Sequence, residues 1–563
     1  MKKNIIEIAM ETALTPQILG GIEDKMGLYA AIRSAMSTSV GGIGPLLRER
    51  IIAQADLGIN VIGVTLLYNQ VWIQRWHSWG QFYLEKGNSA EYIRPLIRKW
   101  DTGLRVNMPD GVEQAVTVWE AVYGKGKVYF LDAPRITNIV YPGPEDAPVE
   151  VDNAQEWAKQ SRIRQSWLLG RGGLELLKAL KMRPDCIVLS ETPTIFGCHR
   201  LVADGLDKEG LFREAKYIFN DHTPLEYAHP VWSEEQMKLL KIKPECYKNL
   251  ESYKRNPDKI DITQLIVNSA DAVYGVSRKH GEVMRKMHSL VPYADKIKTI
   301  TNGVSCDIWQ ADALKKYDKL SDNDLLAVKQ SEKEKLIDWM WLRYKFSSGW
   351  RQSKKTSPLV IWMRRVTSYK RLDILKEIIN NDAWRKRFVD LGITIFLGGR
   401  IHQNDAHSDW LVFELLDIIQ KYPELEGLLI LLDNFNVWEA PRMFRGMDAA
   451  IMISNAGREA SATGFMKAQL NGAMVIATCD GAIAESVYFY RNNPKGVIPN
   501  GFRVEYEDDC PTPETLLKAL EQFKQVYDNI PLRIQMIRSA LARKDKVDVM
   551  RTAREMENLY KQL

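Results

Sequence analysis

The sequence predicts an α/β protein built from two Rossmann-like lobes. Its 563 residues are more than one hydrophobic core usually organises, so two large domains are expected. Short apolar runs rich in β-branched residues alternate with amphipathic stretches at helical spacing, which is the pattern of parallel sheets covered by helices. Ligands of such sheets collect at the carboxyl ends of the strands, so the loops that follow the predicted strands are the candidate functional segments.

The second half of the chain shows this alternation most clearly. Five predicted strands alternate with four predicted helices at 359–363, 372–380, 394–397, 410–421, 428–432, 437–446, 449–453, 465–471 and 474–478. In the first half we expect helices at 48–56 and 173–182 and strands at 61–67 and 186–189. The charged stretch 307–357 is interpreted as a helical connection between lobes, and 549–561 as a final amphipathic helix.

Three regions follow from this pattern. We predict an N-terminal Rossmann-like lobe over 1–305 and a C-terminal Rossmann-like lobe over 306–535. The remaining segment, 536–563, is expected to form a C-terminal helix that packs back on the first lobe.

Composition and charge exclude several classes of protein. The 77 basic and 71 acidic side chains give a net charge of +6 that is spread along the chain, so no nucleic acid partner is expected. Six scattered cysteines, none at metal-ligand spacing, are typical of a reduced cytoplasmic protein without a metal site. Glu7 and Glu11 interrupt the apolar start, which argues against a signal peptide, and no run approaches the ~20 apolar residues of a membrane span.

The loop after the predicted strand 359–363 carries the strongest chemical signal. It reads Arg364-Arg365-Val366-Thr367-Ser368-Tyr369-Lys370-Arg371 and leads into a helix. Guanidinium and ammonium groups suit phosphate oxygens, and cations at a helix N-terminus oppose the helix dipole unless an anion is present. We interpret this loop as an anion site; the alternative is a solvated basic helix cap.

A second signal is a lysine that follows a run of small residues. The run is Arg458-Glu459-Ala460-Ser461-Ala462-Thr463-Gly464-Phe465-Met466-Lys467, which leads from a strand end into a helix. A lysine in apolar surroundings has a lowered pKa and can serve as the amine of a Schiff base. The alternative is that Lys467 is an ordinary surface lysine.

Two further loops are weaker signals. The paired glycines of Ser39-Val40-Gly41-Gly42-Ile43-Gly44-Pro45 let backbone N–H groups approach a phosphate, although a plain turn would use the same residues. The segment Phe219-Asn220-Asp221-His222-Thr223-Pro224, which we expect to follow a helix, suits a substrate-contacting loop. A purely structural role is the alternative for His222.

Taken together, these segments resemble the α-glucan (glycogen, maltodextrin and starch) phosphorylases, most closely the short bacterial and archaeal branch. Segment 364–371 matches the family's K/R-R-x-x-x-Y-K-R run, and segment 459–467 matches its E-A-S-G-T-G/S-x-M-K run. Further matches in chain order are Gly41-Gly42-Ile43-Gly44, Ala55-Asp56-Leu57-Gly58, 63–68, His222-Thr223-Pro224, 275–283, Thr301-Asn302-Gly303-Val304, Asn471-Gly472-Ala473 and Asp480-Gly481-Ala482. Many ordered matches are far more specific than any one of them.

The resemblance implies the GT-B glycosyltransferase architecture, with two lobes facing across a cleft, and pyridoxal 5'-phosphate bound covalently as an aldimine on Lys467. By resemblance, the cofactor would also be held by Thr463, Gly464, Arg364, Phe435 and the backbone of Gly42. The catalytic residues would be Arg365 and Lys370, on the substrate phosphate, with His222 and Glu459 on the glucosyl unit. Further substrate contacts would come from Gly41, Asn302, Tyr369, Ser461 and Ala462.

The activity that the resemblance implies is reversible phosphorolysis of linear α-1,4-glucan or maltodextrin to glucose 1-phosphate, with retention. Inorganic phosphate would protonate the leaving oxygen and then attack the oxocarbenium-like sugar, while the cofactor phosphate relays protons. We recognise no carboxylate pair of the kind that retaining glycosidases use. Because the chain is shorter than the animal enzymes, their regulatory extensions and allosteric sites are expected to be absent; a homodimer is left open.

The sequence also departs from the family. Asn436 replaces a cofactor-contacting arginine, Pro193 a histidine, Ala462 a glycine, and Pro45 the arginine of long phosphorylases. Two other functions are therefore weighed. A glycogen-synthase-like retaining glycosyltransferase with a nucleotide-sugar donor shares the arginine-lysine loop but has a second glutamate near the position of Lys467. The other alternative is a relative that binds glucan but has no catalytic activity.

Overall fold

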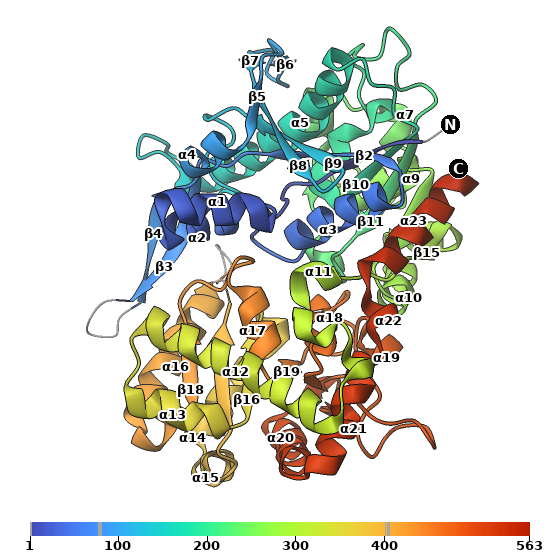
Figure 1. The fold of residues 1–563 in the computed structure, drawn as a ribbon. Helices are drawn as coiled ribbons and strands as arrows, with labels where there is room; N and C mark the ends of the chain where they lie inside the picture. Colours follow the sequence, from blue (N-terminus) through green and yellow to red (C-terminus); the bar gives the residue numbers. More distant parts are fainter. Residues whose placement is uncertain (1–2, 77–81, 400, 402–405) are drawn as a thin grey trace. The chain divides into compact units, whose positions relative to one another are not determined.

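The computed structural model describes residues 3–76, 82–399, 401 and 406–563, and the chain forms two compact units (Figure 1). The first unit comprises Met1–Trp72, Lys86–Thr301 and Thr552–Leu563, and the second comprises Ile73–Glu85 and Asn302–Arg551. The chain thus leaves the first unit after Thr301, where the sequence analysis expects a division after 305. It returns to the first unit at Thr552, not at 536.

The first unit contains a nine-stranded sheet in which β1 (Asn4–Ile8) lies near the middle. The strand order is β15 (Ile297–Thr299), β14 (Ala272–Gly275), β11 (Lys216–Asp221), β10 (Cys186–Ser190), β1, β2 (Asn60–Leu66), β9 (Gly126–Asp132), β8 (Thr117–Tyr123) and β5 (Arg98–Trp100). From β15 to β9, neighbouring strands in this order are parallel, whereas β8 pairs antiparallel with both β9 and β5. The order reverses at β1, as in a Rossmann sheet.

Strand β1 is not predicted from the sequence, because a charged residue, Glu7, falls inside its apolar run. Glu7 is fully buried in this strand, where it accepts hydrogen bonds from Arg50 at 2.6 Å and from Gln54 at 2.8 Å. Both partners lie on α3 (Ile43–Asp56), which contains the expected helix 48–56. The buried pair therefore joins the central strand to a covering helix, and loss of either partner would leave an uncompensated buried charge.

The second unit contains a six-stranded parallel sheet. Its strand order is β18 (Leu429–Leu432), β17 (Thr394–Gly398), β16 (Leu359–Met363), β19 (Ala449–Met452), β20 (Met474–Ala477) and β21 (Gly501–Arg503). Numbered along the chain this is 3-2-1-4-5-6, the Rossmann order, whose switch point lies between β16 and β19. The five predicted strands are confirmed, and β21 is an additional edge strand.

Alternate residues of these strands face two different cores. On β16, Val360 and Trp362 contribute to one hydrophobic cluster, whereas Leu359, Ile361 and Met363 contribute to the other. Helices therefore cover both faces of the sheet, as a parallel sheet requires. The helices are α12 (Asp322–Tyr344), α13 (Ser348–Thr356), α14 (Asp373–Asn380), α15 (Asp382–Asp390), α16 (Ala406–Lys421), α17 (Ala440–Gly446), α18 (Thr463–Gln469), α20 (Pro513–Asp528) and α21 (Ile530–Leu541).

Three other predictions can be compared with the helices that the structure describes. The predicted helix 173–182 is the end of a longer helix, α5 (Ala154–Ala179). The predicted final helix is α23 (Val549–Gln562), and the stretch 307–357 folds within the second unit. In the described residues, no helix combines the length and the apolar character needed to cross a bilayer. The prediction of an α/β fold with two Rossmann-like lobes is confirmed.

Candidate active site

One buried ion pair joins the two loops at the switch point of the second unit. Arg364 follows β16, and its guanidinium donates hydrogen bonds to the Glu459 carboxylate and to the Ile453 carbonyl, both on the chain that follows β19. The side chains of the pair are only 6% and 11% exposed. The backbone N–H of Arg364 donates to the Gly398 carbonyl at 2.8 Å, which fixes the start of its loop against β17.

The loop after β19 is held by hydrogen bonds to two carboxylates. Asp480 accepts the backbone N–H groups of Arg458 and Glu459, both at 3.0 Å, and Glu459 accepts that of Ala462 at 3.1 Å. Burial raises the pKa of the Glu459 carboxyl, but the neighbouring cations outweigh burial and lower that pKa below its ordinary value. The Glu459 carboxylate is therefore ionised and is directed at its arginine partner.

Lys370 adds a further cation beside this pair. Burial lowers the pKa of Lys370 to about 7, and Arg364 and Arg365 act in the same direction against the attraction of Glu459. Arg364 and Lys370 thus lie beside one carboxylate, and Arg365 adds a third cation to the same loop, an arrangement that an added anion would stabilise. The adjacent Tyr369 is neutral, because burial raises the pKa of its phenol to about 12.

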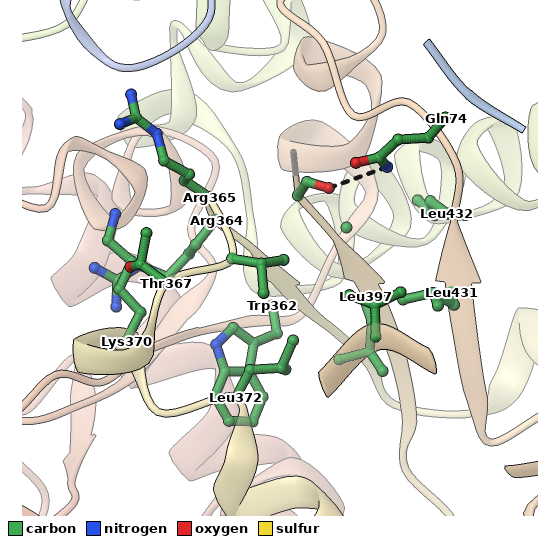
Figure 2. A pocket seen from close by; sticks show the side chains of 14 residues that line it. Gln74, Trp362, Arg364, Arg365, Thr367, Lys370, Leu372, Leu397, Leu431 and Leu432 are labelled. Atoms are coloured by element: carbon green, nitrogen blue, oxygen red, sulfur yellow. Dashed lines mark hydrogen bonds between the residues drawn. The ribbon is translucent and has the colours of Figure 1, made fainter. Parts of the chain in front are cut away.

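These cations line a pocket at the carboxyl ends of β16 and β17 (Figure 2). Figure 2 shows Arg364, Thr367 and Lys370 on one side of the pocket, with the side chain of Arg365 pointing away from them. The remaining wall is largely apolar. Apolar walls with a few charged groups are typical of a small-molecule site, whereas a solvated helix cap would leave its cations exposed.

The backbone conformation of Ala462 explains why the family motif has a glycine at this position. Ala462 has φ of +61° and ψ of 47°, in the left-handed region that favours glycine, and it precedes the first residue of α18, Thr463. Alanine adopts this conformation at a cost of about 1–2 kcal/mol in local conformational energy, which glycine would avoid.

Helix α18 carries the lysine that the sequence analysis assigns to the cofactor. The Nζ atom of Lys467 lies 3.9 Å from the ring centroid of Trp309 and 5.7 Å from that of Phe444. Gly464, one turn earlier, packs against Met452, where an added Cβ would lie 2.3 Å from the methionine methyl carbon. The amine therefore lies on an aromatic surface, and its contact with Trp309 was not foreseen from the sequence.

The glycine loop of the first unit holds an anion that the protein itself supplies. The Glu11 carboxylate accepts hydrogen bonds from the backbone N–H groups of Val40 and Gly41, the latter at 3.1 Å. The turn also requires glycine at 44, because a Cβ there would lie 2.6 Å from Ser39 Oγ. The backbone of Gly41 thus points its N–H at a carboxylate, and Gly42 leads directly into α3.

The loop that contains His222 continues a strand, so the expectation that it follows a helix is wrong. Residues up to Asp221 belong to β11, and the turn after it is fixed by Glu191, which accepts the backbone N–H of His222 at 2.7 Å and the hydroxyl of Thr223 at 3.1 Å. Burial lowers the pKa of His222 to about 3, so its imidazole is neutral. Among the described residues its buried Nε2 atom has no hydrogen-bond partner and can accept one from a ligand.

A group of ionisable side chains behind this loop was missed by the sequence analysis. Asp221 lies 3.6 Å from the His229 ring and 3.9 Å from that of His280. Burial lowers the pKa of His229, but Asp221 outweighs burial and raises it to about 9. Burial, with Asp221, raises the pKa of Glu191 to about 8. The described residues contain no group of three or more side chains arranged to hold a metal ion.

Two other predicted sugar contacts also carry unsatisfied polar atoms. The Nδ2 atom of Asn302 and the Oγ atom of Ser461 are buried and lack hydrogen-bond partners within the described part of the chain. The carbonyl of Asn302 accepts a hydrogen bond from Arg551 at 2.9 Å, and the following Gly303 packs so closely on Asp548 that a Cβ would lie 2.6 Å from its carbonyl oxygen. Buried atoms of this kind are expected where a polar ligand binds.

The remaining departures have local structural roles. Asn436, in place of the family's arginine, accepts the backbone N–H groups of Trp438 at 2.9 Å and Glu439 at 3.1 Å, and so stabilises the turn before α17. Phe435 lies beside Gly398 at the end of β17. Pro193 is the second residue of a short 3-10 helix, Thr192–Gly197, which begins directly after Glu191.

Comparison with known proteins agrees with the fold and the loops. The family model for carbohydrate phosphorylases matches residues 312–489, and that for the starch synthase catalytic domain matches residues 28–292. Among solved structures, the catalytic domain of starch synthase IV from Arabidopsis thaliana, bound to ADP and acarbose, superposes with a TM-score of 0.72 at 18% identity, covering 100% of this chain and 99% of that one. The two units therefore define the GT-B class of glycosyltransferase architecture.

Relatives in sequence come from the phosphorylases. Maltodextrin phosphorylase of Thermococcus litoralis is 24% identical over 91% of this chain and 68% of its own length. Glycogen phosphorylase of Aquifex aeolicus is 24% identical over 85% of this chain and 76% of its own length. The predicted resemblance to the α-glucan phosphorylases is confirmed: the chain is similar to phosphorylases in sequence and to a starch synthase catalytic domain in fold.

The lowered pKa of Lys370 gives a testable pH dependence. In the free protein Lys370 is charged below pH 7 and neutral above it, so an anion that pairs with its ammonium binds best at low pH. Sulfate, which keeps its charge over this range, should lose affinity by up to about tenfold per pH unit above pH 7. Isothermal titration calorimetry with sulfate measures this slope.

The matched control is Lys370→Arg, whose guanidinium stays charged throughout and should bind sulfate with little change between about pH 6 and 9. A wild-type affinity that does not depend on pH, or the same slope in both proteins, would show that Lys370 does not bind the anion.

Proposed function

We propose that this protein is an α-1,4-glucan phosphorylase, which reversibly converts linear glucan or maltodextrin and inorganic phosphate to glucose 1-phosphate. The observation that carries the proposal is the group of three cations Arg364, Arg365 and Lys370 at the switch point of the second unit, two of which lie beside the Glu459 carboxylate. The similarity to maltodextrin and glycogen phosphorylases over most of the chain supports the same substrates. All six cysteines are free thiols, which fits a cytoplasmic location.

The residues around Lys467 fit pyridoxal 5'-phosphate as the cofactor. The amine of Lys467 rests on the ring of Trp309 and near that of Phe444, where it could condense with the carbonyl group of the cofactor. Thr463 and the close backbone at Gly464 stand one turn before it, and Ser461 offers a buried hydroxyl without a partner in the described structure. When bound, the cofactor supplies a phosphate group that can exchange protons with the substrate phosphate.

The protein's own residues then have distinct tasks. Lys370 and Arg365 would bind the oxygens of inorganic phosphate, and Arg364 would neutralise the second anion next to it. The bound phosphate gives a proton to the glycosidic oxygen, the C1–O bond breaks, and a phosphate oxygen bonds to C1 on the same face of the sugar. His222, neutral at physiological pH, would accept a hydrogen bond from a sugar hydroxyl, and Asn302 would donate one.

A second function is supported by specific similarities. The starch synthase family model covers the first half of the chain, and the solved starch synthase IV domain carries ADP. A nucleotide-sugar donor would place a diphosphate beside the same cations, with no need for a cofactor on Lys467. Transfer of glucose from a nucleotide sugar to maltodextrin is therefore the alternative activity, and a glucan-binding protein without catalysis is the third.

The direct test of the proposed activity offers both donors to the purified protein. With maltodextrin and phosphate we expect release of glucose 1-phosphate that depends on phosphate and reverses when glucose 1-phosphate is added. With ADP-glucose or UDP-glucose we expect no lengthening of maltodextrin. Glucan elongation from a nucleotide sugar without phosphorolysis would establish the alternative, and glucan binding with neither activity would establish the third.

The cofactor assignment is tested separately from activity. Lys467→Ala should retain its circular dichroism spectrum but lose the near-ultraviolet and visible absorbance of bound pyridoxal phosphate. Lys370→Ala is the matched control, because it removes a lysine from the same site and should keep the absorbance. Borohydride reduction of the wild type should attach the label to the peptide that contains Lys467; a label on another lysine, or normal absorbance in Lys467→Ala, contradicts the assignment.

A further inference from the structure

A segment from the first half of the chain closes the pocket described above. Strand β3 (Gln70–Trp76) and strand β4 (Phe82–Asn88) form a hairpin, whose segment Ile73–Glu85 belongs to the second unit. Gln74 lines the pocket together with Arg364 and Arg365, and it is only 6% exposed. Figure 2 shows its side chain on the side of the pocket opposite the cations.

The backbone of Gln74 is anchored by one side chain. Its N–H donates to Asn434 Oδ1 at 2.8 Å, and its carbonyl accepts from Asn434 Nδ2, also at 2.8 Å. Asn434 follows the end of β18 and is itself buried. The hairpin is therefore docked at the carboxyl end of the sheet, in the part of a Rossmann unit where ligands bind.

The carboxamide of Gln74 makes three hydrogen bonds to backbone groups at the strand ends. Its Nε2 atom donates to the carbonyls of Asp433 and Gly399, the latter at 3.3 Å, and its Oε1 atom accepts the N–H of Ile401 at 3.0 Å. The opposite orientation would face the amide oxygen toward two carbonyls, so these partners fix the orientation. Gly399 also allows the Arg364 backbone to approach, since a Cβ there would overlap the Arg364 carbonyl oxygen.

The same backbone groups are complementary to the edge of a nucleobase. An adenine edge presents a donor beside an acceptor, as a carboxamide does, and so it would pair with the same carbonyl and N–H groups. The apolar wall formed by Trp362, Leu397 and Leu431 would suit the flat face of a base. A base that entered this pocket would have to displace Gln74 and leave its amide without partners.

We propose that Gln74 is a specificity-determining residue that excludes nucleotides: its carboxamide occupies the backbone groups that would bind a base and leaves the adjacent cations to a simple phosphate. The proposal rests on the proposed function, for which it explains why the cation cluster would take phosphate instead of a nucleoside diphosphate. The bridge between Val366 and Ile401 connects the Gln74 contacts to the phosphate loop, so the closed pocket and the anion site share one wall.

The test measures binding of ADP and of pyrophosphate by isothermal titration calorimetry to the full-length protein. Wild type should bind ADP with a Kd weaker than about 1 mM, and Gln74→Ala should bind it at least about tenfold more tightly. Pyrophosphate, which has no base, should bind both proteins equally. Gln70→Ala, the same substitution earlier on β3 and outside the pocket, should match the wild type for both ligands.

An ADP affinity in Gln74→Ala no tighter than in the wild type would overturn the proposal, as would micromolar binding of ADP by the wild type. If Gln74→Ala fails to fold by circular dichroism, Gln74→Asn, whose amide is one methylene too short to reach both carbonyls, is measured in the same way. Phosphorolysis is assayed on the same wild-type preparation. Absence of glucose 1-phosphate with the expected ADP results would reject the proposed function but retain the exclusion of nucleotides.

Discussion

The ion pair between Arg364 and Glu459 is the interaction on which the rest of the candidate site depends. It connects the loop after β16 with the loop after β19, the two strands between which the order of the second sheet reverses. A switch point leaves two loops diverging from neighbouring strands, so their side chains can enclose a ligand only if something holds the loops together. Here a buried guanidinium and carboxylate do so, and Asp480 fixes the second loop through two of its N–H groups.

The candidate site contains more positively charged side chains than carboxylates. Arg364 is matched by Glu459, but Arg365 and Lys370 add charge to the same pocket wall, and the consequence is visible in the lowered pKa of Lys370. Such a cluster is unfavourable in the free protein and becomes favourable when an anion enters, which is the usual physical signature of a functional site. The first unit shows the complementary case, since Glu11 already satisfies N–H groups of the glycine loop.

Much of the fold follows from the sequence because the strands of the second unit are apolar on both faces and are separated by helices of ordinary length. Strand β1 was not predicted because Glu7 breaks its apolar run, and only the tertiary pairing with Arg50 makes that charge tolerable. The helix expected before His222 was wrong for a related reason: the alternation of a short buried strand cannot be distinguished from a helix by periodicity alone.

The site could be predicted where the residue types of one local motif carry the chemistry. It could not be predicted where residues distant in the sequence supply the chemistry. The cations of the run 364–371 indicate an anion site directly. Ala462 could be recognised from the sequence as a departure from the family motif, although only its φ of +61° explains why glycine is usual at this position. Gln74 gave no signal in the sequence, because the partners that define its role are backbone groups more than 300 residues away. The surroundings of Lys467 likewise depend on Trp309, which no local pattern connects to it.

The central claim is that the switch point of the second unit binds a phosphate through its cation cluster. The most direct measurement is a crystal structure of the purified protein with inorganic phosphate. We predict phosphate within hydrogen-bonding distance of Lys370 Nζ and of at least one of the guanidinium groups of Arg364 and Arg365, with Gln74 still bound to the strand ends. Phosphate bound elsewhere, with this pocket containing only water, would contradict the account.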